Sequence, residues 1–143
     1  MSNLMRSALC LTALAAALAF TPALADTLKY KATLSGPGET PPNDTKGTGT
    51  IEATYDSAAG TLSWTGSYSG LTGPAIAAHF HGPAAAGTNS GVLVPVDATA
   101  SPFSGSANIG ADVAKDFADG MVYFNIHTSA HKPGEIRGQL APE

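Results

Sequence analysis

Residues 47–68 read GTGTIEATYDSAAGTLSWTGSY, two runs rich in Thr, Tyr and Trp on either side of a short turn segment. β-branched and aromatic side chains favour the pleated, half-buried surface of a strand. The turn segment, residues 56–60, combines Asp, Ser and Gly, which are typical turn residues. We therefore expect a β-hairpin here, and the hairpin favours an all-β domain.

Outside this hairpin, short strand-like segments recur about every ten residues between Gly, Pro, Asn and Asp, the spacing of a sandwich or barrel. A loop rich in proline and glycine is expected at residues 35–46. Only residues 111–118 favour a helix, with Asp112 as its cap and Val113 and Phe117 one turn apart. The fold class predicted is an antiparallel β-sandwich or Greek-key-like barrel with at most one short helix. Further strands are expected at residues 28–34, 76–81, 91–96, 121–127 and 135–140.

The first 25 residues have the composition of an export signal. Arg6 is the only charge, an apolar run extends from Ala8 to Phe20, and Ala23-Leu24-Ala25 has the small-x-small pattern of a cleavage site before Asp26. The run is shorter than the about 20 apolar residues of a transmembrane helix. We therefore expect a cleaved signal peptide at 1–25, one β domain at 26–143 without a membrane span, and a periplasmic or secreted location.

Cysteine content and charge narrow the possible partners. Cys10 is the only cysteine and lies in the expected signal, so the mature chain would have neither disulfides nor thiolate metal ligands. The chain has seven Lys and Arg against eleven Asp and Glu, a formal net charge of −4. Because no basic cluster occurs, the sequence argues against nucleic acid or anionic lipid as a partner.

All four histidines fall in two short clusters, residues 79–81 and 127–131. Strand side chains alternate with period two, so the imidazoles flanking Phe80 should share the face that Phe80 does not use. On the strand at 121–127, the same alternation puts the histidine on a polar face with Tyr123 and Asn125. If the two strands are neighbours, three imidazoles converge at their ends. The expected metal ligands are His79, His81 and His127, with His131 as an optional fourth.

Imidazole nitrogens suit copper, zinc or nickel, whereas calcium and magnesium prefer oxygen ligands. A second group lies on the last strand, where Glu135, Arg137 and Gln139 share one face. Glu135 and Arg137 are close enough to pair. They either orient a histidine through its other ring nitrogen or form a surface salt bridge contributing about 0–1 kcal/mol. Without a metal, the polar face of Tyr, Asn and His could bind a peptide or glycan instead.

The histidine clusters stand within longer motifs. These are AHFHGPA at 78–84, Gly91-Val92, GMVYFNIHT at 120–128 and PGEIRGQL at 133–140, preceded by Leu34-Ser35-Gly36, Glu39, Pro41-Pro42 and Gly47-x-Gly49. In this order they resemble the CHRD domain, a family named after chordin that also occurs as a single exported domain in bacteria. The resemblance covers residues 27–141 and implies a β-sandwich-like domain. It supplies a fold rather than an activity, so function is argued from the site.

Three functions remain open. The first is an exported protein that binds a transition metal, with copper favoured over zinc or nickel. The second is an extracellular or periplasmic interaction or scaffold module without metal, whose partner is another exported protein. The third is a copper-dependent redox enzyme that resembles superoxide dismutase only in architecture, since the long metal-binding loop and the disulfide are missing. No Gly-x-Ser-x-Gly motif occurs, no catalytic residue is assigned, and a non-catalytic role is favoured.

Overall fold

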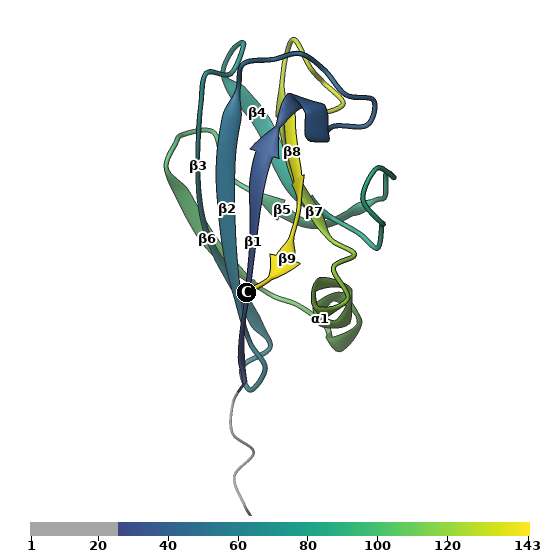
Figure 1. The fold of residues 1–143 in the computed structure, drawn as a ribbon. Helices are drawn as coiled ribbons and strands as arrows, with labels where there is room; N and C mark the ends of the chain where they lie inside the picture. The colour runs from purple at the N-terminus through teal and green to yellow at the C-terminus, as the bar shows by residue number, and fades with distance from the viewer. Residues whose placement is uncertain (1–25) are drawn as a thin grey trace, which may run out of the picture.

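The computed structural model describes residues 26–143 (Figure 1), so the expected signal peptide lies outside the described residues. Strands dominate this part of the chain, with one short α-helix, α1 (Ala111–Ala118), and one 3-10 turn, η1 (Gly36–Gly38). The strands are β1 (Thr27–Ser35), β2 (Thr48–Asp56), β3 (Thr61–Ser69), β4 (Ala75–His81), β5 (Val92–Val96), β6 (Phe103–Asn108), β7 (Tyr123–Thr128), β8 (Ile136–Gln139) and β9 (Ala141–Pro142).

The strands form one antiparallel, nearly closed barrel in the order β5-β4-β7-β8-β1-β2-β3-β6, with β9 paired to β1. This confirms the predicted all-β class, the antiparallel barrel and the single short helix. The hairpin predicted at residues 47–68 is β2–β3, in which Tyr55 pairs with Leu62 and Ala53 with Trp64. Two sequence-distant strands, β4 and β7, are also direct neighbours.

Alternation along the strands explains which side chains fill the barrel. In β1, Tyr30, Ala32 and Leu34 are buried while the residues between them are exposed. Phe80 of β4 lies at the centre of the aromatic core, with ring centroids 5.5 Å from Trp64 and 4.9 Å from Phe124. Tilted and edge-on aromatic pairs of this kind add about 0.5–1.5 kcal/mol each beyond the burial of their area.

The helix α1 has the bounds predicted for it, and it covers one end of the barrel (Figure 1). Phe117 is fully buried, and its ring centroid lies 5.4 Å from Tyr30 and 5.5 Å from Phe80. The predicted cap is wrong. Gly110 is the N-cap and makes no side-chain cap bond, whereas Asp112 lies in the first turn, where a negative charge favours the helix dipole.

The strands β6 and β9 were not expected from the sequence. Only Phe103 of β6 is buried, so the segment lacks the apolar alternation that marks a strand. It forms because β3 offers it an edge to pair with, Trp64 lying opposite Gly105. A Cβ at position 105 would stand 2.7 Å from the Trp64 ring, so glycine is what lets the indole lie across β6.

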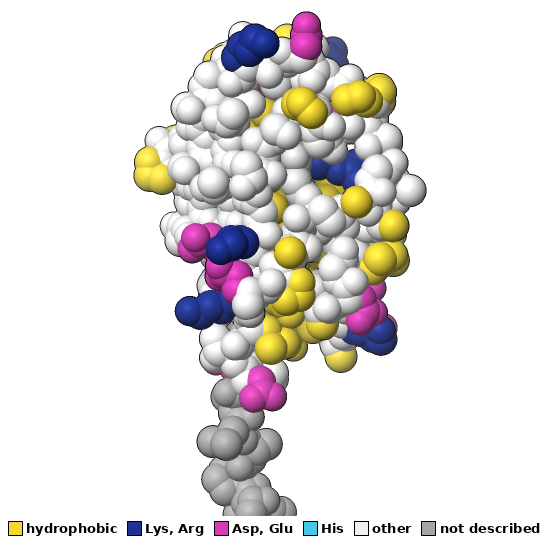
Figure 2. All heavy atoms as spheres, viewed as in Figure 1, with side chains coloured by type: hydrophobic (Ala, Val, Ile, Leu, Met, Phe, Trp, Pro, Cys, Tyr) yellow, Lys and Arg dark blue, Asp and Glu magenta, His cyan; other side chains and the backbone are white. Residues whose placement is uncertain are grey.

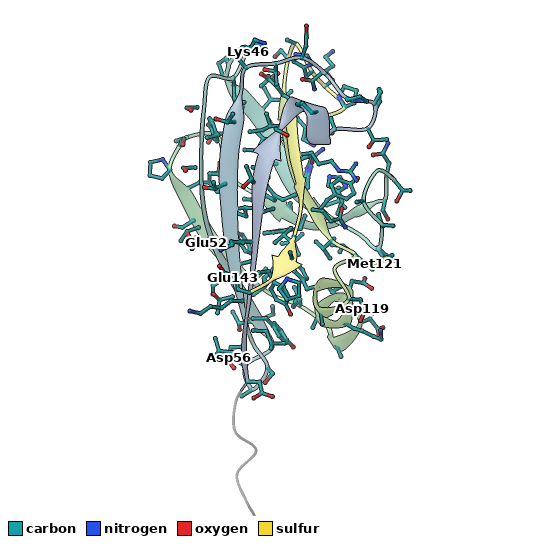
Figure 3. The ribbon with its side chains drawn as sticks, viewed as in Figure 1. Lys46, Glu52, Asp56, Asp119, Met121 and Glu143 are labelled. Atoms are coloured by element: carbon teal, nitrogen blue, oxygen red, sulfur yellow. The ribbon has the colours of Figure 1, made fainter. Side chains whose placement is uncertain are left out.

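The outer face of β1, β2 and β3 is polar but carries few charges. Its exposed side chains are mostly hydroxyls, among them Thr33, Thr50 and Ser67. Figure 2 shows this as a largely white surface on which no histidine side chain is visible. Glu52 projects from the middle of β2, with Lys46 and Asp56 near its two ends (Figure 3).

Candidate metal centre

The histidines of β4 and β7 meet because these strands are antiparallel neighbours. In the register, His79 lies opposite Asn125 and Ala77 lies opposite His127. Phe80 points into the core, as alternation requires, so its two histidine neighbours lie on the other face of β4. The small side chain of Ala77 leaves the ring of His127 free to lean towards His79.

His79, His81 and His127 each offer one ring nitrogen, and these three atoms lie within 4.8 Å of one another. The shortest separation is 3.1 Å, between His79 Nδ1 and His127 Nε2. Two nitrogens bound tetrahedrally to one zinc at 2.0–2.1 Å stand about 3.3 Å apart. The pair His79–His127 therefore already has about the spacing of two ligands of one ion, and the third nitrogen, within 4.8 Å of them, would have to move inward to share it.

Backbone carbonyls fix the orientation of two of the rings. His81 Nδ1 lies 3.0 Å from Ser90 O, and His127 Nδ1 lies 2.8 Å from Lys132 O. A carbonyl can only accept, so each Nδ1 carries the proton and donates it, which leaves Nε2 as the unprotonated nitrogen of each ring. Metal-binding histidines are commonly held in this way by a partner on the second nitrogen.

Within the described residues 26–143, His81 Nε2 is buried and has no hydrogen-bond partner. A buried acceptor without a donor costs about 1–3 kcal/mol. A metal ion beside His79 and His127 would accept this lone pair. The three nitrogen donors therefore fit a transition-metal ion.

The surroundings of His79 and His81 favour the neutral form of both rings. Burial lowers the pKa of His79, and the neighbouring His127 and His81 lower it further. Burial also lowers the pKa of His81, although the hydrogen bond to Ser90 O opposes this effect in part. Neutral imidazoles are the form that binds metal, so both rings are ready to do so at neutral pH.

The fourth histidine does not join this group. His131 lies in the loop after β7, where its backbone bonds with Thr128 and Gly134 turn the chain. It is absent from the cluster of His79, His81 and His127. Met121 carries the only thioether in residues 26–143, and it lies beside α1 rather than in the triad (Figure 3).

The expected pairing of Glu135 with Arg137 is wrong, because both are buried and they turn to different partners. Glu135 is fully buried and accepts hydrogen bonds from Thr45, Thr72 and Thr128. Burial alone raises the pKa of Glu135, but these hydrogen bonds outweigh it and hold the pKa below its ordinary value. The carboxylate thus ties β7 and two loops together.

Arg137 lies instead on the same side as Tyr123. Its guanidinium carbon stands 3.4 Å from the centroid of the Tyr123 ring, and that ring stacks on His81 with centroids 4.8 Å apart and planes 4° apart. Tyr123 and Asn125 are each 3% exposed, so the face expected to be polar is in fact covered. A buried layer therefore lies beneath the triad.

Glu39 belongs to this layer, although sequence reasoning gave it no role there. Burial raises the pKa of Glu39 to about 7, against the lowering effect of the Arg137 charge. A Cβ on Gly134 would stand 2.2 Å from Glu39 Oε1, so only glycine lets the carboxyl lie there. Only the motif residue Gly134 hinted at this contact in the sequence, and nothing local to Glu39 marked it.

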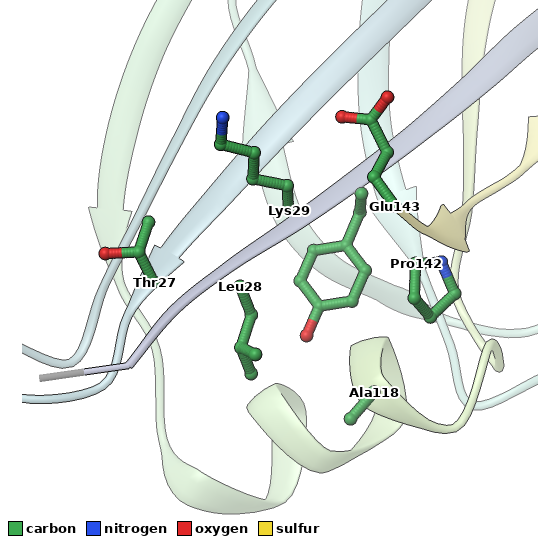
Figure 4. A pocket seen from close by; sticks show the side chains of 7 residues that line it. Thr27, Leu28, Lys29, Ala118, Pro142 and Glu143 are labelled. Carbon is green, nitrogen blue, oxygen red and sulfur yellow. The ribbon is translucent and has the colours of Figure 1, made fainter.

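A separate hollow of about 320 Å³ lies between the start of β1, the C-terminal residues and α1 (Figure 4). Leu28 and Ala118 are among its lining residues, and none of the histidines is. Within residues 26–143, no helix combines the length and the apolar character that a membrane crossing requires.

Comparison with known families gives one result. The family model described as CHRD domain matches residues 30–140, which include every strand from β2 to β8 and the three clustered histidines. No curated protein and no solved structure matches the chain at a significant level.

Proposed function

This chain belongs to the CHRD domain family, and from that premise we propose that it is an exported domain that binds one transition-metal ion through His79, His81 and His127. The observation that carries the proposal is the buried Nε2 of His81, which has no hydrogen-bond partner within residues 26–143 and lies in a cluster of three imidazoles. The signal-like N-terminal sequence supports a periplasmic or secreted location for this domain.

Each histidine has a defined part in this site. His81 and His127 would bind through Nε2, since their Nδ1 protons are held by Ser90 O and Lys132 O. His79 would bind through Nδ1, the atom that faces His127. With three protein ligands, a bound ion would keep a coordination position for water or a small molecule.

Copper is the preferred ion. Nitrogen sites bind divalent metals in an order that peaks at Cu²⁺, above Ni²⁺ and Zn²⁺. No thiolate is present in residues 26–143 to favour zinc through a cysteine-rich site. Zinc and nickel are the alternatives. We assign no catalytic residue to this site.

Family membership supports a second candidate, an extracellular or periplasmic interaction module that needs no metal. The two functions differ in what they require of the histidines. Metal binding requires all three rings, whereas an interaction module uses loops and strand edges.

Titration of the purified protein with Cu²⁺, Cu⁺ and Zn²⁺, followed by absorption, EPR and melting temperature, separates these candidates. We expect one ion per chain and nitrogen hyperfine structure in the Cu²⁺ EPR spectrum. The double variant His79→Ala/His127→Ala is the matched test. Absence of binding, or binding that the double variant retains in full, would rule out this site and leave the interaction module.

A further inference from the structure

The loop between β4 and β5 contacts the candidate metal centre through Ser90 O, which accepts from His81 Nδ1. Few apolar contacts hold the loop in this position. Residues 84–90 read AAAGTNS, and of these only Ala84 is buried. Hydrophobic burial scales with the apolar area removed from water, so it contributes little to the position of this loop. Polar side chains from the barrel must fix it instead.

Arg137 supplies part of that polar anchor, beside Gln139, whose Nε2 donates to Ala84 O at 2.8 Å. Arg137 Nη1 donates to Asn89 Oδ1 at 2.8 Å, and its Nη2 donates to Thr88 O at 2.6 Å. Arg137 is 2% exposed, and it forms no ion pair within the part of the chain that the structure describes. A buried guanidinium is costly unless hydrogen-bonded, and the acceptors that satisfy this one come from the loop.

Tyr123 links the same loop to a metal ligand. Its hydroxyl accepts a hydrogen bond from Ser90 N at 3.2 Å and donates to Ser90 O at 3.3 Å. Ser90 O is also the acceptor for His81 Nδ1 at 3.0 Å. The Tyr123 ring stacks on the His81 ring, and the guanidinium carbon of Arg137 lies close to the centroid of the same Tyr123 ring.

We propose that Arg137 is a positioning residue, which holds residues 88–90 and Tyr123 so that Ser90 O fixes the proton of His81 on Nδ1. The lone pair of His81 Nε2 is thereby presented to the ion. The effect on affinity rests on the proposed metal function. The effect on the His81 tautomer does not, because it concerns the metal-free protein.

The exposed residue Asn89 offers a test that leaves the core intact. Asn89→Ala removes one of the acceptors of Arg137 and also the hydrogen bond from Asn89 Nδ2 to Thr40 O, and the matched control is Asn108→Ala, an exposed asparagine on β6 whose Oδ1 accepts from Thr61. Arg137→Gln and Tyr123→Phe test the anchor directly. Long-range ¹⁵N–¹H NMR at pH 8 on the metal-free proteins reports which ring nitrogen of His81 carries the proton.

We expect the Nδ1–H tautomer alone in the wild type and the control, and a mixture with Nε2–H in the three anchor variants. Copper and zinc affinity should fall about 10–100-fold in those variants, the usual range when a group that orients a ligand is lost. Melting temperature is measured in parallel. A lower melting temperature with an unchanged tautomer and affinity overturns the proposal, because Arg137 would then only stabilise the barrel.

The two hypotheses fail in different ways. A wild type that binds neither copper nor zinc, with the tautomer shifted in Asn89→Ala, supports the positioning role and overturns the metal function. A wild type that binds copper, with affinity and tautomer unchanged in Asn89→Ala, Arg137→Gln and Tyr123→Phe, overturns the positioning role alone.

Discussion

His79 Nδ1 lies 3.1 Å from His127 Nε2, although 48 residues separate the two along the chain. His127 donates its Nδ1 proton to Lys132 O, so its Nε2 is an acceptor and His79 Nδ1 must donate to it. A metal ion bound by both nitrogens would take the place of that proton. Metal binding should therefore shift the proton of His79 from Nδ1 to Nε2, a change of tautomer that releases no net proton while the ring is neutral.

Removal of any one of the three clustered histidines should weaken metal binding severely. For His79→Ala, His81→Ala and His127→Ala we expect a loss beyond the about 10–100-fold that follows from changes to orienting groups. His131→Ala is the control and should bind as the wild type does, since His131 lies outside the cluster. Competition titration with a chelator measures the four affinities. An equal loss in His131→Ala would mean that the site needs a fourth ligand.

A bound ion should also stabilise the fold. At a free ion concentration 100 times its dissociation constant, the free energy of unfolding rises by about 2.7 kcal/mol if the unfolded chain does not bind. Chemical denaturation with and without zinc measures this gain, since zinc adds no redox chemistry. The His81→Ala variant should lose the gain, and a full gain in that variant would place the ion elsewhere.

Glu135→Gln should destabilise the barrel by about 2–4 kcal/mol, because charge-assisted hydrogen bonds from Thr45, Thr72 and Thr128 are lost or weakened. The pKa of Glu135 is lowered in the folded state, so its stabilisation is present above the unfolded pKa and is lost as pH falls through the folded pKa.

Urea denaturation at pH 7 and in acid tests this prediction. The difference in the free energy of unfolding between the wild type and Glu135→Gln should shrink as the pH is lowered. Glu52→Gln on the exposed outer face of β2 is the control and should stay within about 0.5 kcal/mol of the wild type. Equal stability of Glu135→Gln and the wild type at pH 7 would contradict the role of Glu135.

The opposite pH dependence is expected for Glu39, whose pKa is raised to about 7 by burial. The folded protein binds the Glu39 proton more tightly than the unfolded chain does. The contribution of this proton to the free energy of unfolding is therefore full below the unfolded pKa and is lost as pH rises through about 7. Glu39→Gln keeps the shape without the charge. Relative to the wild type, the variant should gain about 1–2 kcal/mol between pH 5 and pH 8, measured by urea denaturation. Parallel pH curves would show that Glu39 does not titrate in this range.

The stability of the barrel end that α1 covers should depend mainly on the side chain of Phe117. Phe117→Ala should cost about 3–5 kcal/mol, the range for truncating a buried phenylalanine, since Phe117 packs on Tyr30 and Phe80. Lys115→Ala on the same helix removes only an exposed ion pair with Asp119, which is worth about 0–1 kcal/mol. Thermal unfolding compares them, and similar losses would mean that α1 does not close the core.

Much of the local structure could be predicted from the sequence. Period-two alternation identified β1, the β2–β3 hairpin and the core side of Phe80, while Val113 and Phe117 marked the helix. These signals are local, since they depend on which side chains stand two or four positions apart. The segment β6 escaped because pairing with β3, rather than its own apolar pattern, makes it a strand.

The sequence by itself determined that the histidines at 79 and 81 share a face, that no thiolate serves in residues 26–143, and that the family is CHRD-like. Only the tertiary structure decided the rest. It joined β4 to β7, left His131 outside the cluster, and separated Glu135 from Arg137. The physical reason is that backbone carbonyls and sheet register hold the rings in place. The side-chain sequence does not show which carbonyl will accept from a given ring, because every residue carries the same carbonyl.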